Sequence, residues 1–294
     1  MAPAGDIGSL HHLLLSRHGG LLHLTPTLDS FRRIREEEAG RLLRSVAYSC
    51  AAGHGGSAVV DIGERVCRAM NDTVVRSAVG GRCARRDEFL RELHRAVVLT
   101  SGFNLALSEL TRNPRAMRRA QAEVREAFRG QQRLTEADTA RLRYLPLVVK
   151  ETLRLHVPVP FLLPRECREA CRVMGYDVPR GTKVLVSAWA IARDAAYWDD
   201  TEVFRPQRFE GTGGVYFRGT DFEFIPFGAG RRMCPGMALG LVNMELALAG
   251  LLYHFDWTLS DGDGKVLDMS EAFGITVKRK SKLVLRATPR APCS

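Results

Sequence analysis

The stretch FIPFGAGRRMCPGMALG, residues 224–240, gathers two aromatic residues, several glycines, two arginines and one cysteine just before an apolar segment. The cysteine is Cys234, which stands between Met233 and Pro235. A cysteine binds metal as its thiolate, so its surroundings must stabilise negative charge on sulfur. The unpaired N–H groups and the dipole of a helix N-terminus do this, and Pro235 suits a first helical turn. The stretch therefore predicts a metal-binding thiolate at the start of a helix.

The neighbours of Cys234 indicate which cofactor the thiolate would hold. Gly228, Gly230 and Gly236 let the backbone pass close to a flat, bulky partner. The guanidinium of Arg232 is a fixed fork of donors that suits a carboxylate. A flat cofactor that has carboxylates and a metal that accepts thiolate is a haem. For this stretch taken alone, the alternative is an inert buried cysteine beside a glycine loop.

The spacing of this motif resembles the haem-ligand signature of the cytochrome P450 family, at Phe227, Gly230, Arg232, Cys234 and Gly236. The resemblance implies that the cysteine thiolate is the axial iron ligand, whose electron donation favours O–O cleavage. It also implies that the arginine binds a haem propionate and that the phenylalanine packs beside the sulfur. The implied fold is mainly α-helical with small β-sheets. The implied activity is mono-oxygenation of a small organic metabolite with electrons from NADPH–cytochrome P450 reductase.

A second match lies in the segment KETLR, in which Glu151 and Arg154 share a helix face. Such pairs are common on exposed helices, where they contribute little to stability. The downstream segment FRPQRF resembles the Pro-Glu-Arg-Phe segment of the family, with Gln207 in place of the glutamate. The resemblance implies that Glu151, Arg154 and Arg208 form a buried triad on the haem-proximal side. Loss of one member would then leave a buried charge unpaired.

A third match is the segment LPREC, where Arg165 occupies a position that in the family often contacts a second propionate. From Asn113 to its end the chain reads continuously like a plant microsomal cytochrome P450. We therefore expect residues 113–294 to form the haem-binding part of a single incomplete domain that comprises residues 1–294.

Three parts of the family pattern are missing from the sequence. No segment has the form Ala/Gly-Gly-x-Asp/Glu-Thr-Thr/Ser, whose acid and alcohol supply protons during oxygen activation in the family. Compared with the family pattern, LTSGFNLA runs directly into LSELTRNP without the central helix between them. A second gap relative to that pattern follows GGLLHL, early in the chain. Trp189 and Arg193 have the spacing of an early propionate contact, but they lie in the later segment WAIARD. We expect a family member without its anchor, an early helical block and the central helix, and we predict no catalytic residue.

The charge balance of the chain excludes few classes of function. The formal net charge is +10, with 43 Lys and Arg against 33 Asp and Glu in 294 residues. Bases and acids are mixed, as in FRRIREEEAGRLLR, which indicates solvated helix faces. No nucleic-acid-binding module is recognisable, so we predict no nucleic-acid partner. The basic balance also fits an acidic reductase near Arg231 and Arg232. Two alternatives stay open: a non-catalytic remnant that binds haem weakly or not at all, and a basic helical interaction protein.

The seven dispersed cysteines predict reduced thiols rather than a disulfide framework. Cys167 and Cys171 are four residues apart, but no other Cys or His cluster completes a zinc site, so we expect ordinary thiols. We expect no membrane anchor, because the apolar run GMALGLVNMELALAGLLYHF contains Asn243 and Glu245. The family implies the endoplasmic reticulum membrane, and a chain without an anchor would be cytoplasmic.

Hydrophobic periodicity predicts helices early and strands late in the chain. Asp29 or Ser30 is expected to cap the first helix and Asn113 the third. The predicted helices cover residues 29–46, 58–80, 113–130, 144–156 and 234–255. The predicted strands lie in residues 171–190, with PRGT as the turn between them, and in residues 273–289.

Overall fold

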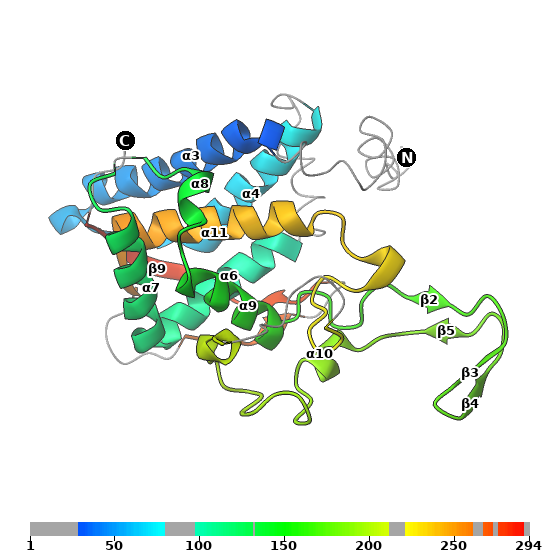
Figure 1. Cartoon of the computed structure of the whole chain (residues 1–294). Coiled ribbons are helices and arrows are strands. Elements are labelled where there is room, and N and C mark those ends of the chain that lie inside the picture. The colour runs from blue at the N-terminus through cyan, green and yellow to red at the C-terminus, as the bar shows by residue number, and fades with distance from the viewer. Residues whose placement is uncertain are drawn as a thin grey trace.

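The computed structural model describes residues 29–79, 98–131, 133–211, 221–260, 267–272 and 276–290. Helices make up its body, and short antiparallel sheets lie at the edges (Figure 1). The predicted fold class, mainly α-helical with small sheets, is therefore confirmed. The helices are α3 (Arg32–Ala52), α4 (Ile62–Val79), α6 (Val98–Arg112), α7 (Pro114–Ala127), α8 (Glu136–Thr139), α9 (Tyr144–Leu155), α10 (Ala188–Ile191) and α11 (Met237–His254).

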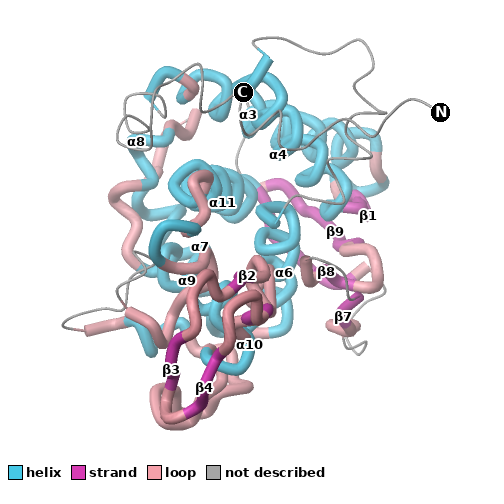
Figure 2. The backbone as a smooth tube through the Cα atoms, turned by 90° about the vertical axis from the view of Figure 1, so that its right-hand side faces the viewer, coloured by secondary structure: helices cyan, strands magenta, loops and turns pink. Residues whose placement is uncertain are grey.

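The helix α11 is the centre of the hydrophobic core (Figures 1 and 2). It packs against α3, α6, α7, α8 and α9, so that Met244, Leu248 and Leu251 are almost completely buried. Burial on this scale stabilises the fold by about 1.5–3 kcal/mol for each large apolar side chain. By length and composition alone α11 could also cross a membrane, but 67% of it is buried inside this protein.

The helices predicted over residues 29–46, 113–130, 144–156 and 234–255 are confirmed by α3, α7, α9 and α11. The expected side-chain caps are not, although Asn113 does stand at the N-cap position of α7. Phe31 stands at the N-cap of α3, while Asp29 pairs with Arg32 at 2.8 Å. The side-chain amide of Asn113 donates to the carbonyl oxygen of Glu109 at 2.8 Å, so it caps the preceding helix rather than its own.

A three-stranded antiparallel sheet covers one end of the core, in the order β1 (Ala58–Asp61), β9 (Val284–Pro289), β6 (Phe255–Leu259). The prediction of one helix over residues 58–80 is wrong in its first four residues, which form β1. The β-branched Val59 and Val60 pair there with β9. Helix α4 begins at Ile62, where the Asp61 carboxylate accepts a hydrogen bond from the Glu64 N–H at 3.0 Å. Its predicted end at Gly80 lies outside the described residues.

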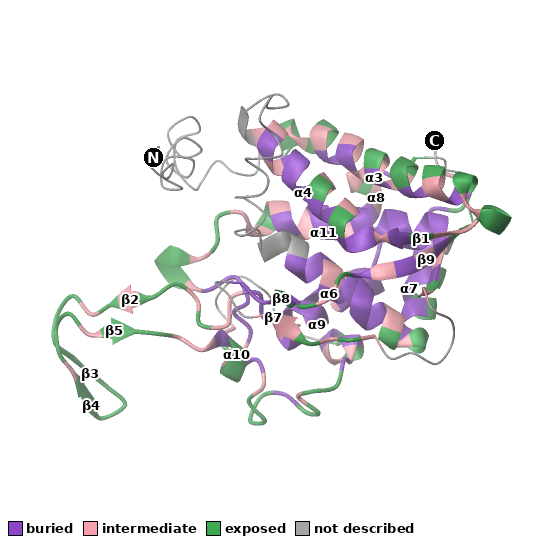
Figure 3. Ribbon diagram, turned by 180° about the vertical axis from the view of Figure 1, so that it is seen from behind, coloured by how far each residue is buried: buried purple, intermediate pink, exposed green. Residues whose placement is uncertain are grey.

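A mostly exposed β arm extends from the helical body (Figures 1 and 3). In it β2 (Arg165–Glu166) pairs with β5 (Lys183–Val184), and β3 (Cys171–Val173) pairs with β4 (Tyr176–Val178). The hairpin turn between β3 and β4 is Met174–Gly175, with φ of 49° and 89°. This left-handed pair is typical of a two-residue hairpin turn. PRGT is a turn between two strands, as predicted, because it connects β4 to β5. These two strands do not pair with each other, and the hairpin is closed by Met174–Gly175 instead.

The junction of LTSGFNLA and LSELTRNP lies inside one unbroken helix, α6. Its apolar residues Phe103, Leu107 and Leu110 are fully buried against its neighbours α4, α9 and α11. Near the end of the chain, β8 (Lys278–Arg279) and β9 confirm the two strands predicted in residues 273–289, and β8 pairs with β7 (Glu271–Ala272).

Candidate functional site

Cys234 lies in a loop that ends at the N-terminus of α11, three residues before the helix begins. The loop folds back on itself, because the N–H of Cys234 donates to the carbonyl oxygen of Phe227 at 2.9 Å. Phe227 is 7% exposed, so it anchors the loop in the core, whereas Cys234 is exposed. Gly236 occupies the N-cap position of α11. The fold thus presents a thiol at the surface while holding the backbone beneath it.

Two glycines make the tight turns of this loop possible. Gly228 and Gly230 have φ of 75° and 68°, in the left-handed region that costs other residues about 1–2 kcal/mol. A Cβ on Gly230 would meet no neighbouring atom within 4 Å, and a Cβ on Gly236 would lie 3.9 Å from the Cys234 sulfur. The positive φ therefore explains why residue 230 is a glycine. At residue 236, the missing side chain leaves the space beside the thiol open.

Two arginines join the cysteine loop to the β arm. Arg165 donates from Nη2 to the carbonyl oxygen of Ala229 at 3.3 Å, and Arg232 donates from Nη1 to that of Pro164 at 3.1 Å. The Nε of Arg165 is buried and has no hydrogen-bond partner in the described part of the chain. An unpaired buried donor is costly, and a carboxylate would satisfy it. These residues therefore fit a cofactor that has carboxylates.

The surroundings of the Cys234 thiol make it harder to ionise than an ordinary cysteine. Desolvation by the protein on its inner side raises the pKa of the thiol, and a hydrogen bond from the Gly236 N–H opposes this rise without cancelling it. The hydrogen bond from Gly236, at the start of α11, therefore does not bring the pKa of the thiol below its ordinary value. A metal cation would do so, because a coordinating thiol loses its proton. No group of three His, Cys, Asp or Glu side chains within the described ranges could hold a metal.

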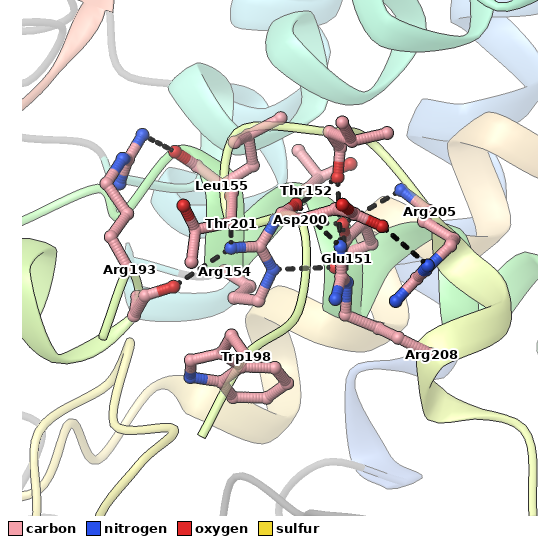
Figure 4. A network of polar contacts seen from close by, with 12 residues as sticks. Glu151, Thr152, Arg154, Leu155, Arg193, Trp198, Asp200, Thr201, Arg205 and Arg208 are labelled. Carbon is pink, nitrogen blue, oxygen red and sulfur yellow. Dashed lines mark hydrogen bonds and ion pairs between the residues drawn. The ribbon is translucent and has the colours of Figure 1, made fainter. Parts of the chain in front are cut away.

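The structure brings Glu151, Arg154 and Arg208 together (Figure 4). Glu151 accepts from Nε and Nη2 of Arg154 at 2.8 and 2.9 Å, and from Nε of Arg208 at 3.0 Å. Glu151 and Arg154 are fully buried. Such a bidentate pair is geometrically specific, and in a buried setting each partner depends on the other for compensation of its charge.

Backbone groups complete this polar network. The N–H of Arg205 donates to Glu151 at 2.9 Å, and Nη1 of Arg154 donates to the carbonyl oxygens of Ala192 and Thr201 at 2.9 and 2.8 Å. Helix α9 supplies the first two triad residues, and a short 3₁₀ turn, Pro206–Phe209, supplies the third. The network therefore fixes the path of the loops that follow α10.

Trp198, which we did not identify from the sequence, connects the triad to the cysteine loop. The guanidinium of Arg154 lies 5.6 Å from the centroid of the Trp198 ring. Trp198 packs edge-on against Phe224 at a centroid distance of 6.0 Å, and its indole N–H donates to the Glu223 carbonyl oxygen at 3.3 Å. Phe224 is the first residue of the stretch that contains Cys234. Through Trp198 and Phe224, the triad thus supports the loop that contains Cys234.

A second buried cluster, also not identified from the sequence, ties three elements together. Nε2 of His156 lies 2.9 Å from a Glu109 oxygen, and Nδ1 lies 3.0 Å from a Glu271 oxygen. Burial disfavours the charged imidazole, but the hydrogen bonds to the two carboxylates outweigh it and raise the pKa of His156. The cluster joins α6, the end of α9 and β7. Trp189 and Arg193 form a cation–π pair at 4.4 Å, and Arg193 also pairs with Glu202 at 3.0 Å.

We expect Glu245 on α11 to make stability depend on pH. Burial raises its pKa from 4.5 to about 7. The folded chain therefore holds a proton on Glu245 more tightly than the unfolded chain does. The resulting contribution to the free energy of unfolding is fully present below pH 4.5 and is lost as the pH rises through about 7. Glu245→Gln should raise the free energy of unfolding by about 2 kcal/mol at pH 8, less toward pH 5. Urea titrations across this pH range measure the difference. Glu126→Gln, at an exposed side chain, is the control, and an equally flat profile for both variants would contradict the prediction.

A family model described as Cytochrome P450 matches residues 96–286, more than half of the chain. The chain is 40% identical to zealexin A1 synthase of Zea mays over 357 residues, covering 88% of this chain and 70% of the relative. It is 37% identical to dolabradiene monooxygenase of Zea mays over 362 residues, covering 90% and 71%. It is 47% identical to premnaspirodiene oxygenase of Hyoscyamus muticus over 285 residues, covering 96% and 55%.

The alignments with the two Zea mays proteins are longer than the 294 residues of this chain. They therefore include residues of those relatives that face gaps in this chain.

Proposed function

This chain belongs to the cytochrome P450 family, and from that premise we propose that it is a haem-thiolate mono-oxygenase whose axial ligand is Cys234. The relatives are named monooxygenase and oxygenase, so the chain is an oxidoreductase of this family. One observation carries the assignment of the site: an exposed thiol at the start of α11 lies in a loop that Arg165 and Arg232 flank.

Each residue of the site has a definable task. Bound haem would supply an iron that activates O2, with the thiolate donating electron density. Cys234 would bind the iron and lose its proton to do so. Arg165, with its unpaired buried Nε, and Arg232 would hold the propionates, and Gly236 would keep the space beside the sulfur open. Glu151 and Arg154 would keep the loop in place through Trp198.

The expected partners follow from the family. We propose that electrons come from NADPH–cytochrome P450 reductase, which docks near the exposed Arg231 and Arg232. The substrate is a small organic molecule of plant secondary metabolism. We assign the protein to the endoplasmic reticulum membrane, and its distribution between membrane and soluble fractions of expressing cells tests this assignment.

We propose that coupling between electron use and product formation is poor. The sequence has no acid–alcohol segment of the kind that supplies protons in the family, and α6 runs unbroken across the place where we expect it. The gaps in the alignments with relatives support a missing internal segment. Oxygen activation needs timed proton delivery and exclusion of water. Without both, reduced oxygen would leave as hydrogen peroxide.

Electron accounting tests this proposal. In one reconstituted sample with reductase and a terpene substrate panel, we would measure NADPH consumed, peroxide formed and product formed. We expect most of the NADPH to be recovered as peroxide. Product equal to NADPH would contradict poor coupling and would mean that another segment supplies the protons. The missing internal segment also favours a second candidate function, a non-catalytic remnant. For such a remnant, neither peroxide nor product would exceed the level of a sample without the protein.

A further inference from the structure

Two thiols meet on the β arm, away from the site described above. The sulfur atoms of Cys167 and Cys171 are 3.6 Å apart. Cys171 is exposed and Cys167 is partly exposed, whereas Cys50 and Cys67 are buried. Reagents in solution can therefore reach the pair, while Cys50 and Cys67 are protected in the core.

The backbone holds both cysteines in place. The N–H of Cys167 donates to the Thr182 carbonyl oxygen at 2.9 Å, and its carbonyl oxygen accepts from the Gly181 N–H at 2.8 Å. Cys171 lies opposite Val178 in the β3–β4 pairing. The thiol of Cys167 also donates to the carbonyl oxygen of Glu169, inside the loop that separates the two cysteines, at 2.8 Å. The proximity of the sulfurs is thus built into the register of the arm.

We propose that Cys167 and Cys171 form a redox site that hydrogen peroxide converts to a disulfide. The more exposed Cys171 thiolate attacks one peroxide oxygen, which breaks the O–O bond and gives a sulfenic acid with release of hydroxide. The Cys167 thiolate then attacks the Cys171 sulfur and displaces the second oxygen as hydroxide. Two thiols and one peroxide thus give one disulfide and two waters, and the sulfurs must close from 3.6 Å to about 2.05 Å.

The disulfide would act on the arm rather than on global stability. The loop that it closes is very short, so the chain entropy removed from the unfolded state is small. Cys167 is two residues from Arg165, whose guanidinium contacts the cysteine loop through Ala229. Oxidation would therefore restrain the segment that carries Arg165, and we expect little change in the melting temperature.

Peptide mapping tests the site directly. Trypsin cleaves after Arg165, Arg168 and Arg172, so the two cysteines fall in separate peptides, ECR and EACR. We would treat the reduced full chain with hydrogen peroxide at pH 8.5, block free thiols by alkylation, digest without reductant and analyse by mass spectrometry. We expect ECR and EACR joined, two hydrogen masses below their sum, with at least a tenfold fall in the alkylation of both. Dithiothreitol should restore both free peptides.

Two variants serve as controls. Cys171→Ser should abolish the joined peptides and leave Cys167 oxidised to sulfinic acid, while Cys234→Ser should give the joined peptides in full. The second result keeps this proposal separate from the haem assignment. Sulfinic acid on both cysteines without a cross-link would overturn the proposal. So would a disulfide from either cysteine to Cys83 or Cys293, or between two chains on a non-reducing gel.

Discussion

Arg154→Ala is expected to lower the free energy of unfolding by about 3–5 kcal/mol, because it leaves a buried carboxylate without its bidentate partner. Glu151 is fully buried and would keep only Arg208 and one backbone N–H. The carbonyl oxygens of Ala192 and Thr201 would also lose their donor. Urea denaturation followed by circular dichroism measures the loss. If the variant does not fold, Arg154→Lys, which keeps the charge but not the bidentate geometry, provides an intermediate step.

A matched control lies in the same network. The side chain of Arg205 pairs with Asp200 at 2.9 Å, and both are well exposed, so Arg205→Ala should change the free energy of unfolding by about 1 kcal/mol at most. Its backbone N–H, which donates to Glu151, stays in place. If Arg205→Ala lowered the free energy of unfolding as much as Arg154→Ala, removal of any arginine here would have the same effect. That result would contradict the special role of the buried pair.

A double-mutant cycle on Glu151 and Arg208 tests whether the triad acts as one unit. Their atoms are 3.0 Å apart and both side chains are buried, so the combined change should differ clearly from the sum of the single changes. Simple additivity would mean that the residues share no network. Because Arg154 also lies over the Trp198 ring, and Trp198 packs edge-on against Phe224, we expect damage to the triad to loosen the cysteine loop as well.

The features that the sequence predicts well are local. The cysteine loop and α11 follow from residues that are adjacent in the chain, and Glu151 and Arg154 share a face of α9 because they are three residues apart. Their meeting with Arg208, 54 residues beyond Arg154, rests on the family resemblance, since no local pattern indicates it.

The features that the sequence does not reveal depend on partners far along the chain. In sequence, β1 resembles the start of a helix. It forms a strand because it pairs with β9, which lies more than 220 residues later in the chain. Trp198 and the cluster around His156 have no spacing signal, because their contacts come from separate elements. In the β arm, PRGT is a strong turn signal, but Met174–Gly175 forms the hairpin, because Gly175 accepts the left-handed conformation that a two-residue turn requires.

Cys234→Ser is expected to have the largest effect on the proposed activity. A serine hydroxyl has nearly the same size as the thiol but does not ionise to a soft, electron-donating ligand. The variant should therefore retain the fold, since Cys234 is exposed and its backbone N–H still bonds to Phe227. It should lose NADPH-dependent peroxide and product formation to the background level. Cys171→Ser, another exposed cysteine, should retain both, and circular dichroism checks that each variant is folded.

The central claim is that Cys234 binds haem iron as a thiolate. The most direct measurement is the absorption spectrum of the haem-reconstituted chain after reduction and addition of carbon monoxide, recorded beside Cys234→Ser at equal protein concentration. The account predicts a red-shifted, thiolate-type Soret band for the wild-type chain and for Cys171→Ser, and no such band for Cys234→Ser. The same red-shifted band in Cys234→Ser, or its absence from a folded wild-type chain that has taken up haem, would contradict the account.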